Sequence, residues 1–346
     1  MDLWQKLKET ERPILLYGMG NGADKIIDVL ACRGIAVTDF FASDGFVRGQ
    51  VFHQKTVLSA SEAKTRYPDA IVLLAFGSAR DDVLAAVANI RKTHTLYAPD
   101  VPVFGNNLFD DAFYAANKDK FDRARALLAD ERSQKLFDDL IAFKLSGNID
   151  YLWDTQSLSD TVNECLHPES YRYCQDLGAY TGDTAQWMCE LFPNLLFVTA
   201  WEPDPKTFVK LCRYASLCPR VTPLHAASLD YTGTVEFAVS GNRNAGIDAP
   251  GKVASMPCAT LDDIVGRQPV DFIKIDVEGA ERRTLAGAVH TLQTKKPDLL
   301  LSLYHRSEDL FDLPLYLHEI CPDYRLYLRR DKGVPAWDIV LAATCR

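Results

Sequence analysis

The first third of the chain alternates short apolar runs with stretches whose apolar residues recur at helical spacing. The apolar runs occupy 13–17, 35–41 and 70–76, and the amphipathic stretches include 24–33 and 81–91. Apolar runs without polar alternation are typical of parallel strands that are buried on both faces. Residues from about 13 to 107 therefore predict a small sheet of βαβ units with helices on both faces.

The second half repeats this alternation with more strands. The stretch 173–183 predicts a strand that ends at Asp176 and runs into a glycine turn, and apolar runs predict further strands at 195–201, 220–226, 270–276 and 297–304, with helices between them at 184–191, 206–216, 280–292 and 310–320. An alternating segment at 232–239 predicts an extra strand, and the hydrophilic stretch 240–252 is interpreted as a substrate loop. Runs at 324–329 and 337–343, joined by a tight turn at 331–333, predict a final hairpin that adds one antiparallel strand.

A segment without glycine or proline joins the two halves. Residues 110–146 place apolar side chains at helical spacing, which predicts a helical connector. The polar segment 147–170 is interpreted as a lid or as the lead-in to the second half. The fold class is therefore α/β, with Rossmann-like parallel-sheet domains at 1–110 and 171–346 and a helical connector at 111–170.

Composition and charge restrict the classes of binding partner and the cellular location that are expected. The 346 residues are 47% hydrophobic and 25% charged, as in ordinary globular proteins, and the net charge of −9 argues against nucleic acid or an anionic membrane as a partner. Neither a hydrophobic signal region nor an apolar run of the ~20 residues of a membrane span occurs. Nine cysteines occur singly, without a C-x-x-C pair, which indicates reduced thiols and predicts a cytoplasmic protein.

Two glycine turns follow predicted strands. The first, with Gly18, Gly20 and Gly22, fits the dinucleotide fingerprint G-x-G-x-x-A, and Asp44 lies just past the next strand. This turn favours a nucleotide or nucleotide-sugar site, although a module that only packs or presents a substrate would show the same pattern. The second turn, with Gly178, Ala179 and Gly182, follows Asp176 and opens a helix.

The residues around the second turn favour a nucleoside that carries positive charge. Glu202 lies at the end of the next strand, where an acid usually holds ribose hydroxyls. Asp176 would be a poor neighbour for a pyrophosphate, but it suits the sulfonium and amino groups of S-adenosylmethionine. Asp276 and His305 end two later strands, and carboxyl ends of parallel strands share one crevice. We therefore expect these four side chains to converge.

Five motifs in the second half resemble, in order, those of the FkbM-type methyltransferases. They are D-L-G-A-Y-T-G-D, W-E-P-D-P-K-T-F, A-A-S-L-D-Y-T-G, T-L-D-D-I and D-F-I-K-I-D-V-E-G-A-E, and the resemblance covers about 173–344. It implies a class I methyltransferase fold, a seven-stranded sheet with an antiparallel last strand. It also implies methyl transfer from S-adenosylmethionine to a hydroxyl of a sugar, glycan or secondary metabolite. The family's usual G-A-N turn is Gly178-Ala179-Tyr180 here, which puts the asparagine contact in doubt.

The resemblance also assigns roles to individual residues. It implies that Asp176, Gly178 and Gly182 line the methionine part of the cofactor and that Glu202 holds the ribose. Ala227 and Ser228, at the end of the third strand, would lie near the adenine, and Asp276 and Glu278 would face the transferred methyl group.

The expected reaction is an in-line displacement in which the acceptor hydroxyl loses its proton. His305 is the predicted base, because an unperturbed imidazole has a pKa near ~6.5, and Asp276 is its predicted orienter or co-base. No tight spacing requires a metal, but Asp276, Glu278 and His305 offer ligands that could hold Mg²⁺ against a substrate diol. Two alternatives stay open: an NAD(P)-dependent oxidoreductase and a nucleotide-sugar-binding protein, both using the first glycine turn. The acceptor and the oligomeric state are not fixed by the sequence.

Overall fold

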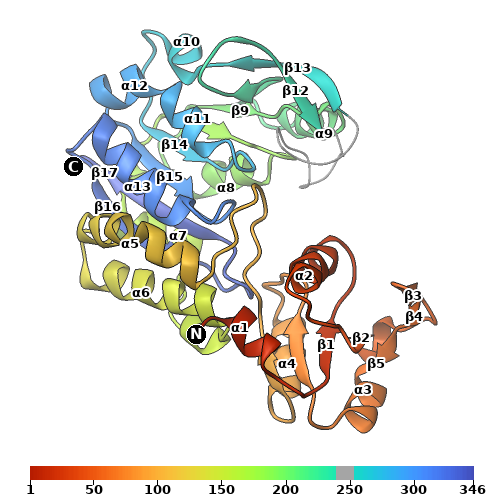
Figure 1. Ribbon diagram of the computed structural model, residues 1–346. Coiled ribbons are helices and arrows are strands. Elements are labelled where there is room, and N and C mark those ends of the chain that lie inside the picture. The colour runs from red at the N-terminus through yellow and green to blue at the C-terminus, as the bar shows by residue number, and fades with distance from the viewer. Residues whose placement is uncertain (239–252) are drawn as a thin grey trace.

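A computed structural model describes residues 1–238 and 253–346. Two α/β parts lie side by side, and a helical segment packs along the C-terminal one (Figure 1). This arrangement confirms the predicted α/β class with two Rossmann-like sheets. The predicted substrate loop at 240–252 lies outside the described residues, and the boundaries of the three predicted segments stay a prediction.

The N-terminal sheet consists of five parallel strands in the order β5-β2-β1-β6-β7. These strands span Leu58–Ser59, Asp39–Ala42, Ile14–Tyr17, Ile71–Leu74 and Thr95–Tyr97. All residues of β1 and β6 are buried, which explains why their sequences show no polar alternation. The short strands β3 (Val51–Phe52) and β4 (Lys55–Thr56) pair with each other outside this sheet.

Helices cover both faces of the N-terminal sheet, as predicted. On one face, α1 (Leu3–Lys8) and α2 (Asn21–Cys32) bury side chains such as Ile26 against Leu16 and Leu73. On the other face, α3 (Ala60–Arg66) and α4 (Asp81–Arg91) pack on residues that include Leu15 and Val72. Successive strand residues point to opposite faces, so the two helix layers use alternate side chains of the same strands.

The predicted connector is helical and attached to the C-terminal part. Helix α5 (Asp111–Ala126) packs against α13 (Asp309–Ile320), with Phe121 and Phe311 in edge contact, their ring centroids 4.7 Å apart. Helix α6 (Glu131–Ser146) packs against β16, where Ser133 Oγ accepts the Leu328 amide N–H at 2.9 Å. The predicted lid or lead-in contains α7 (Leu158–Cys165), between the 3₁₀ turns Ile149–Leu152 and Pro168–Ser170.

The C-terminal sheet has seven strands in the order β10-β9-β8-β14-β15-β17-β16. They are Val221–Leu224, Phe197–Trp201, Tyr173–Leu177, Phe272–Ile275, Asp298–Ser302, Ile339–Thr344 and Arg325–Arg330. Strand β17 is antiparallel to both of its neighbours, as the final hairpin predicted. The strand order reverses between β8 and β14, and ligands of open sheets bind beyond the strand ends at such a switch point.

Most of the predicted helices of the C-terminal part are present, but one prediction was wrong. Helices α8 (Asp183–Leu191) and α9 (Pro205–Ala215) agree with the sequence pattern, and a short helix α10 (Leu261–Val265) is also present. The single helix predicted at 280–292 is divided into α11 (Glu281–Ala286) and α12 (Val289–Thr294). The division falls at Gly287, where a Cβ atom would lie 1.9 Å from the Leu229 carbonyl oxygen.

The extra strand predicted at 232–239 is present as one strand of a small second sheet, whose other two strands were not predicted. Strands β11 (Ala227–Ser228), β13 (Val253–Ala259) and β12 (Gly233–Ala238) form it, in that order. Ala227 and Ser228 therefore do not end the third strand of the main sheet, which stops at Leu224. The turn predicted at 331–333 is also longer, because the connection extends over 331–338 and Val334 forms a two-way backbone pair with Ser78.

Candidate functional site

The second glycine turn leads the chain from β8 into α8 beside a cavity. Gly178 has a φ of +85°, and a Cβ atom there would lie 1.9 Å from the Asp276 carbonyl oxygen. Only glycine fits this approach of two strand ends. Gly182, also at positive φ, is the N-cap residue of α8 and offers no side-chain cap to the helix N–H groups. Backbone donors of this kind can hold the polar atoms of a ligand.

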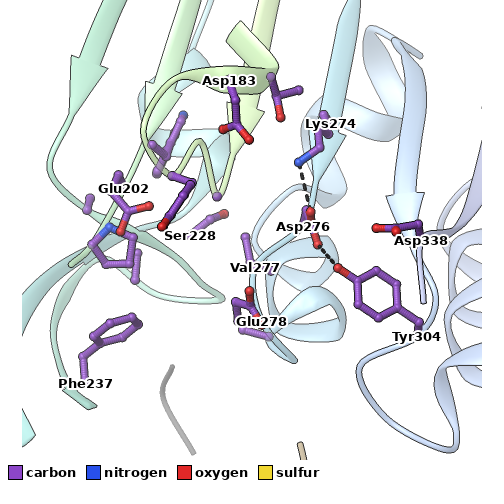
Figure 2. A pocket seen from close by; sticks show the side chains of 18 of the residues that line it. Asp183, Glu202, Ser228, Phe237, Lys274, Asp276, Val277, Glu278, Tyr304 and Asp338 are labelled. Atoms are coloured by element: carbon purple, nitrogen blue, oxygen red, sulfur yellow. Dashed lines mark hydrogen bonds and ion pairs between the residues drawn. The ribbon is translucent and has the colours of Figure 1, made fainter. Parts of the chain in front are cut away.

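The cavity lies at the carboxyl ends of the central strands and has a volume of about 250 Å³. Figure 2 shows Glu202 and Phe237 at one end, Tyr304 and Asp338 at the other, and Asp276 between them. Of the predicted site residues, the cavity wall contains Gly178, Glu202, Ala227, Ser228, Asp276 and Glu278. These six residues come from four separate segments, and of the four strand-end residues expected to converge, Glu202 and Asp276 line the cavity. Their roles stay predictions.

Glu202 is a buried carboxyl group in the wall. Its Oε1 accepts the Asp204 amide N–H at 2.7 Å, and its residue is 7% exposed. Burial raises the pKa of Glu202 to about 8, although the backbone donor lowers it. A group with this pKa would be stabilised in its charged form by a ligand that donates hydroxyl hydrogens.

Asp176 lies behind the wall rather than in it. Its carboxylate is fully buried, and the Lys274 ammonium is 3.9 Å away. Burial raises the pKa of Asp176 to about 6, and Lys274 opposes that rise. Ala179 is also fully buried. Neither Asp176 nor Ala179 lines the cavity, so neither side chain can contact a ligand there directly.

Lys274, Asp276 and Tyr304 form a polar group in the middle of the cavity (Figure 2). Lys274 Nζ lies 3.2 Å from Asp276 Oδ2, and the Tyr304 hydroxyl donates to Oδ1 at 3.3 Å. Burial alone would raise the pKa of Asp276, but Lys274 and then His305 outweigh it and hold the pKa well below its usual range. Asp276 is therefore a carboxylate at neutral pH. Lys274 was missed, although residues two apart on a strand share a face.

His305 does not have the surroundings of a general base. The imidazole is 1% exposed and is not part of the cavity wall; its Nδ1 lies 2.8 Å from Glu281 Oε1. Burial lowers its pKa, but Glu281, Asp276 and Glu278 raise it to about 10. Without a bound cation the ring would therefore carry a proton, which argues against His305 as the base, a role that stays a prediction. Glu281 rather than Asp276 makes the short contact with Nδ1, and no signal in the sequence indicates this pair because the partners lie on different elements.

The first glycine turn and its acid are not brought into one nucleotide site. Gly22 lines a cavity of about 640 Å³ between the two α/β parts, whereas Asp44 lines a different hollow on the opposite face. Both Asp44 oxygens already accept hydrogen bonds from Ser61, at 3.1 Å from its amide and 2.6 Å from its hydroxyl. Gly18 and Gly20 line neither space. Gly22 and Asp44 thus line different hollows, and a nucleotide site at this turn stays a prediction.

The interdomain cavity has a shared border with the first cavity. Asn21, Lys25 and Ser78 of the N-terminal part line it, together with Trp337 of the C-terminal part. Glu278, Tyr304 and Asp338 line both cavities. The two spaces therefore meet at a group of oxygen-bearing side chains.

Residues 176–330 match a family model described as the methyltransferase FkbM domain. Similar solved structures include methyltransferase FkbM from Methylobacillus flagellatus KT, with a TM-score of 0.72 and 22% identity over 96% of this chain and 89% of that chain. This likeness shows the fold of both α/β parts. An rRNA methylase from Streptococcus thermophilus has a TM-score of 0.35 (12% identity, 54% and 92% covered). Fibrillarin from Aeropyrum pernix, in complex with S-adenosyl-L-methionine, has a TM-score of 0.34 (14% identity, 52% and 69% covered). A search of curated proteins gave no match.

Proposed function

We propose, from the match of residues 176–330 to the methyltransferase FkbM domain model, that the protein transfers a methyl group from S-adenosylmethionine to a hydroxyl of a sugar, glycan or secondary metabolite. The observation that carries the proposal is the cavity at the switch point of the C-terminal sheet. One side of this cavity contains the turn at Gly178 and the buried Glu202, which could bind a nucleoside. The same cavity also contains the carboxylates of Asp276 and Glu278.

The cofactor would occupy the half of the cavity that contains Glu202. The Glu202 carboxyl would accept the ribose hydroxyls, and the backbone at Gly178 would lie along the methionine part. Ser228 and Phe237, on the small second sheet, would face the adenine. The buried carboxylate of Asp176 would act from behind the wall, by holding Lys274 and offsetting the positive charge of the cofactor.

The acceptor hydroxyl would then lie at the border of the two cavities. Asp276 is charged at neutral pH, so it can accept the hydroxyl hydrogen and align the oxygen with the methyl group. Glu278, which faces both cavities, is placed to receive the proton when the new C–O bond forms. The remainder of the acceptor would extend into the interdomain cavity, between Ser78 and Trp337.

Ligand-induced stabilisation separates this proposal from the alternatives. A ligand at one hundred times its Kd adds ~2.7 kcal/mol to the free energy of unfolding. We expect S-adenosylhomocysteine to raise the melting temperature and NADH to leave it unchanged. Glu202→Ala should remove the shift, while Glu62→Ala, a matched change in the N-terminal part, should preserve it. A shift with NADH alone would favour the oxidoreductase, and a shift with a nucleotide-sugar alone would favour the binding protein.

A further inference from the structure

His305 is a buried imidazole that faces more carboxylates than it can pair with. Glu281 Oε1 lies 2.8 Å from Nδ1, on one side of the ring. On the other side, Nε2 is 3.4 Å from Glu278 Oε2 and 3.6 Å from Asp276 Oδ1, and by geometry neither ring nitrogen makes a hydrogen bond. A polar atom this deeply buried normally has a close partner.

The separations around Nε2 match those between ligands of a common metal ion. Donor atoms that each bind an ion at about 2.0–2.2 Å lie roughly 3–4 Å from one another. Both contacts of Nε2 fall in that range, whereas they are long for direct hydrogen bonds. One donor atom each from Asp276, Glu281 and His305 also lies within 4.8 Å of the other two.

Glu281 is better placed behind the ring than in the ligand set. Its Oε1 accepts the Val277 amide N–H at 3.0 Å as well as contacting Nδ1. A carboxylate that holds the second nitrogen of a histidine fixes the ring and its tautomer, so that the first nitrogen can bind a metal. Glu278 and Asp276 are the carboxylates that face this first nitrogen.

The charge of the cluster also favours a cation. Asp276, Glu278 and Glu281 surround one imidazole, and the buried carboxyl of Asp309 interacts electrostatically with Glu281. The Lys274 ammonium contacts only the far side of Asp276, at Oδ2. Several carboxylates gathered in a poorly solvated place repel one another unless positive charge lies among them; a protonated His305 ring offsets one negative charge, and a divalent cation would offset two.

We propose that His305 Nε2, Asp276 and Glu278 bind one divalent cation at the wall of the methyl-transfer cavity. One imidazole with carboxylates suits Mn²⁺ or Zn²⁺ better than Mg²⁺, which prefers oxygen ligands alone. This inference rests on the proposed function for its purpose: the ion would bind the acceptor hydroxyl and lower its pKa, and the Glu278 oxygen that does not bind the ion would receive the proton. His305 itself cannot take the proton from the acceptor hydroxyl, because its ring is buried and does not line the cavity.

Binding of Mn²⁺ to the chelator-treated full chain tests the site without an activity assay. Free Mn²⁺ is measured by its electron paramagnetic resonance signal during a titration, and Zn²⁺ is then added as a competitor. We expect one saturable site per chain, with a magnetic coupling from an imidazole nitrogen to the bound ion. Glu278→Gln should weaken binding at least tenfold, and His305→Gln should abolish the nitrogen coupling.

Asp312→Asn is the matched control, because Asp312 forms a surface ion pair with Arg282 at 3.0 Å, away from the cavity wall. It should bind Mn²⁺ like the parent. S-adenosylhomocysteine binding, measured in the same metal-free samples, shows whether each variant is folded. Equal Mn²⁺ binding by Glu278→Gln, or cofactor binding without any saturable Mn²⁺ or Zn²⁺ site, would overturn the metal site alone. Loss of cofactor binding in the parent would instead overturn the proposed function.

Discussion

At the scale of single residues, buried carboxyl groups decide how the cavity responds to a ligand. Burial raises the pKa of Glu202 to about 8 and that of Asp176 to about 6, so both are harder to ionise than free carboxyl groups. A nucleoside that donates hydroxyl hydrogens would stabilise the ionised form of Glu202. Cofactor binding and proton release are therefore linked at this residue.

We expect the affinity for S-adenosylhomocysteine to rise by about tenfold between pH 7 and pH 9. Below pH 8, Glu202 is mostly protonated in the free protein, so binding must displace a proton; above pH 8 no proton is left to displace. Isothermal titration calorimetry in buffers of different ionisation enthalpy should show this release at pH 7. Glu202→Gln should bind more weakly and lose the pH dependence, and a parent affinity that is flat with pH would contradict the role of Glu202.

Replacing Gly178 by alanine should both destabilise the protein and prevent cofactor binding. Its positive φ is unfavourable for alanine by about 1–3 kcal/mol, and the new Cβ would contact the Asp276 carbonyl oxygen. Gly233→Ala is the control, because its nearest neighbour would be the Tyr231 ring at 3.5 Å and its φ is not positive. Urea unfolding and calorimetry measure the two effects. Equal stability of the two variants would show that the strand ends can separate.

At the scale of elements, the strands with regular apolar runs could be predicted from the sequence. Features that depend on contacts between residues distant along the chain could not. Strands β8, β14 and β15 were predictable because their residues are almost all buried, which leaves unbroken apolar runs. Strand β13 was missed because most of its residues alternate between exposed and half-buried and it contains Pro257. Convergence of strand ends was predictable from topology, but the pairing of Glu281 with His305 was not, since side-chain packing decides it.

The connector should depend on Arg329 of β16 for its attachment. The buried Arg329 guanidinium contacts Asp130 Oδ2 at 2.8 Å, Glu164 Oε1 at 3.2 Å and Ser133 Oγ at 2.8 Å. Arg329→Ala removes these contacts from the partly exposed carboxylates of Asp130 and Glu164, so we expect a loss of about 1.5–3 kcal/mol in the free energy of unfolding. Arg125→Ala, which breaks an exposed pair with Asp138, should cost about 0–1 kcal/mol. Similar denaturation midpoints for both variants would exclude this anchoring role.

At the scale of the whole molecule, the N-terminal part supplies a wall to the proposed reaction site. Ser78 and Val334 pair through their backbones at 3.0 and 3.1 Å, and the Phe104 amide N–H donates to the His305 carbonyl at 2.9 Å. These contacts fix the N-terminal part next to the C-terminal part, so that Glu278, Tyr304 and Asp338 line the cavity between them. Gly22 of the first glycine turn lines this cavity, so the turn lies beside a space that a methyl acceptor could fill.

None of the described helices has the length and apolar composition to cross a membrane.

Trp337 tests most directly whether the acceptor binds in the interdomain cavity. It lines that cavity and lies against Gly77 of the N-terminal part, and it is absent from the wall of the cofactor cavity. Trp337→Ala removes an apolar surface from the acceptor's side only. Once an acceptor is found, we expect its KM to rise about tenfold, a typical loss of ~1–2 kcal/mol for one buried contact, with kcat and S-adenosylhomocysteine affinity little changed. Trp153→Ala, at a 63% exposed position away from both cavities, should leave all three constants unchanged. If Trp337→Ala weakened cofactor binding and left KM unchanged, the acceptor would have to approach from elsewhere, and the N-terminal part would lose its proposed role in recognition.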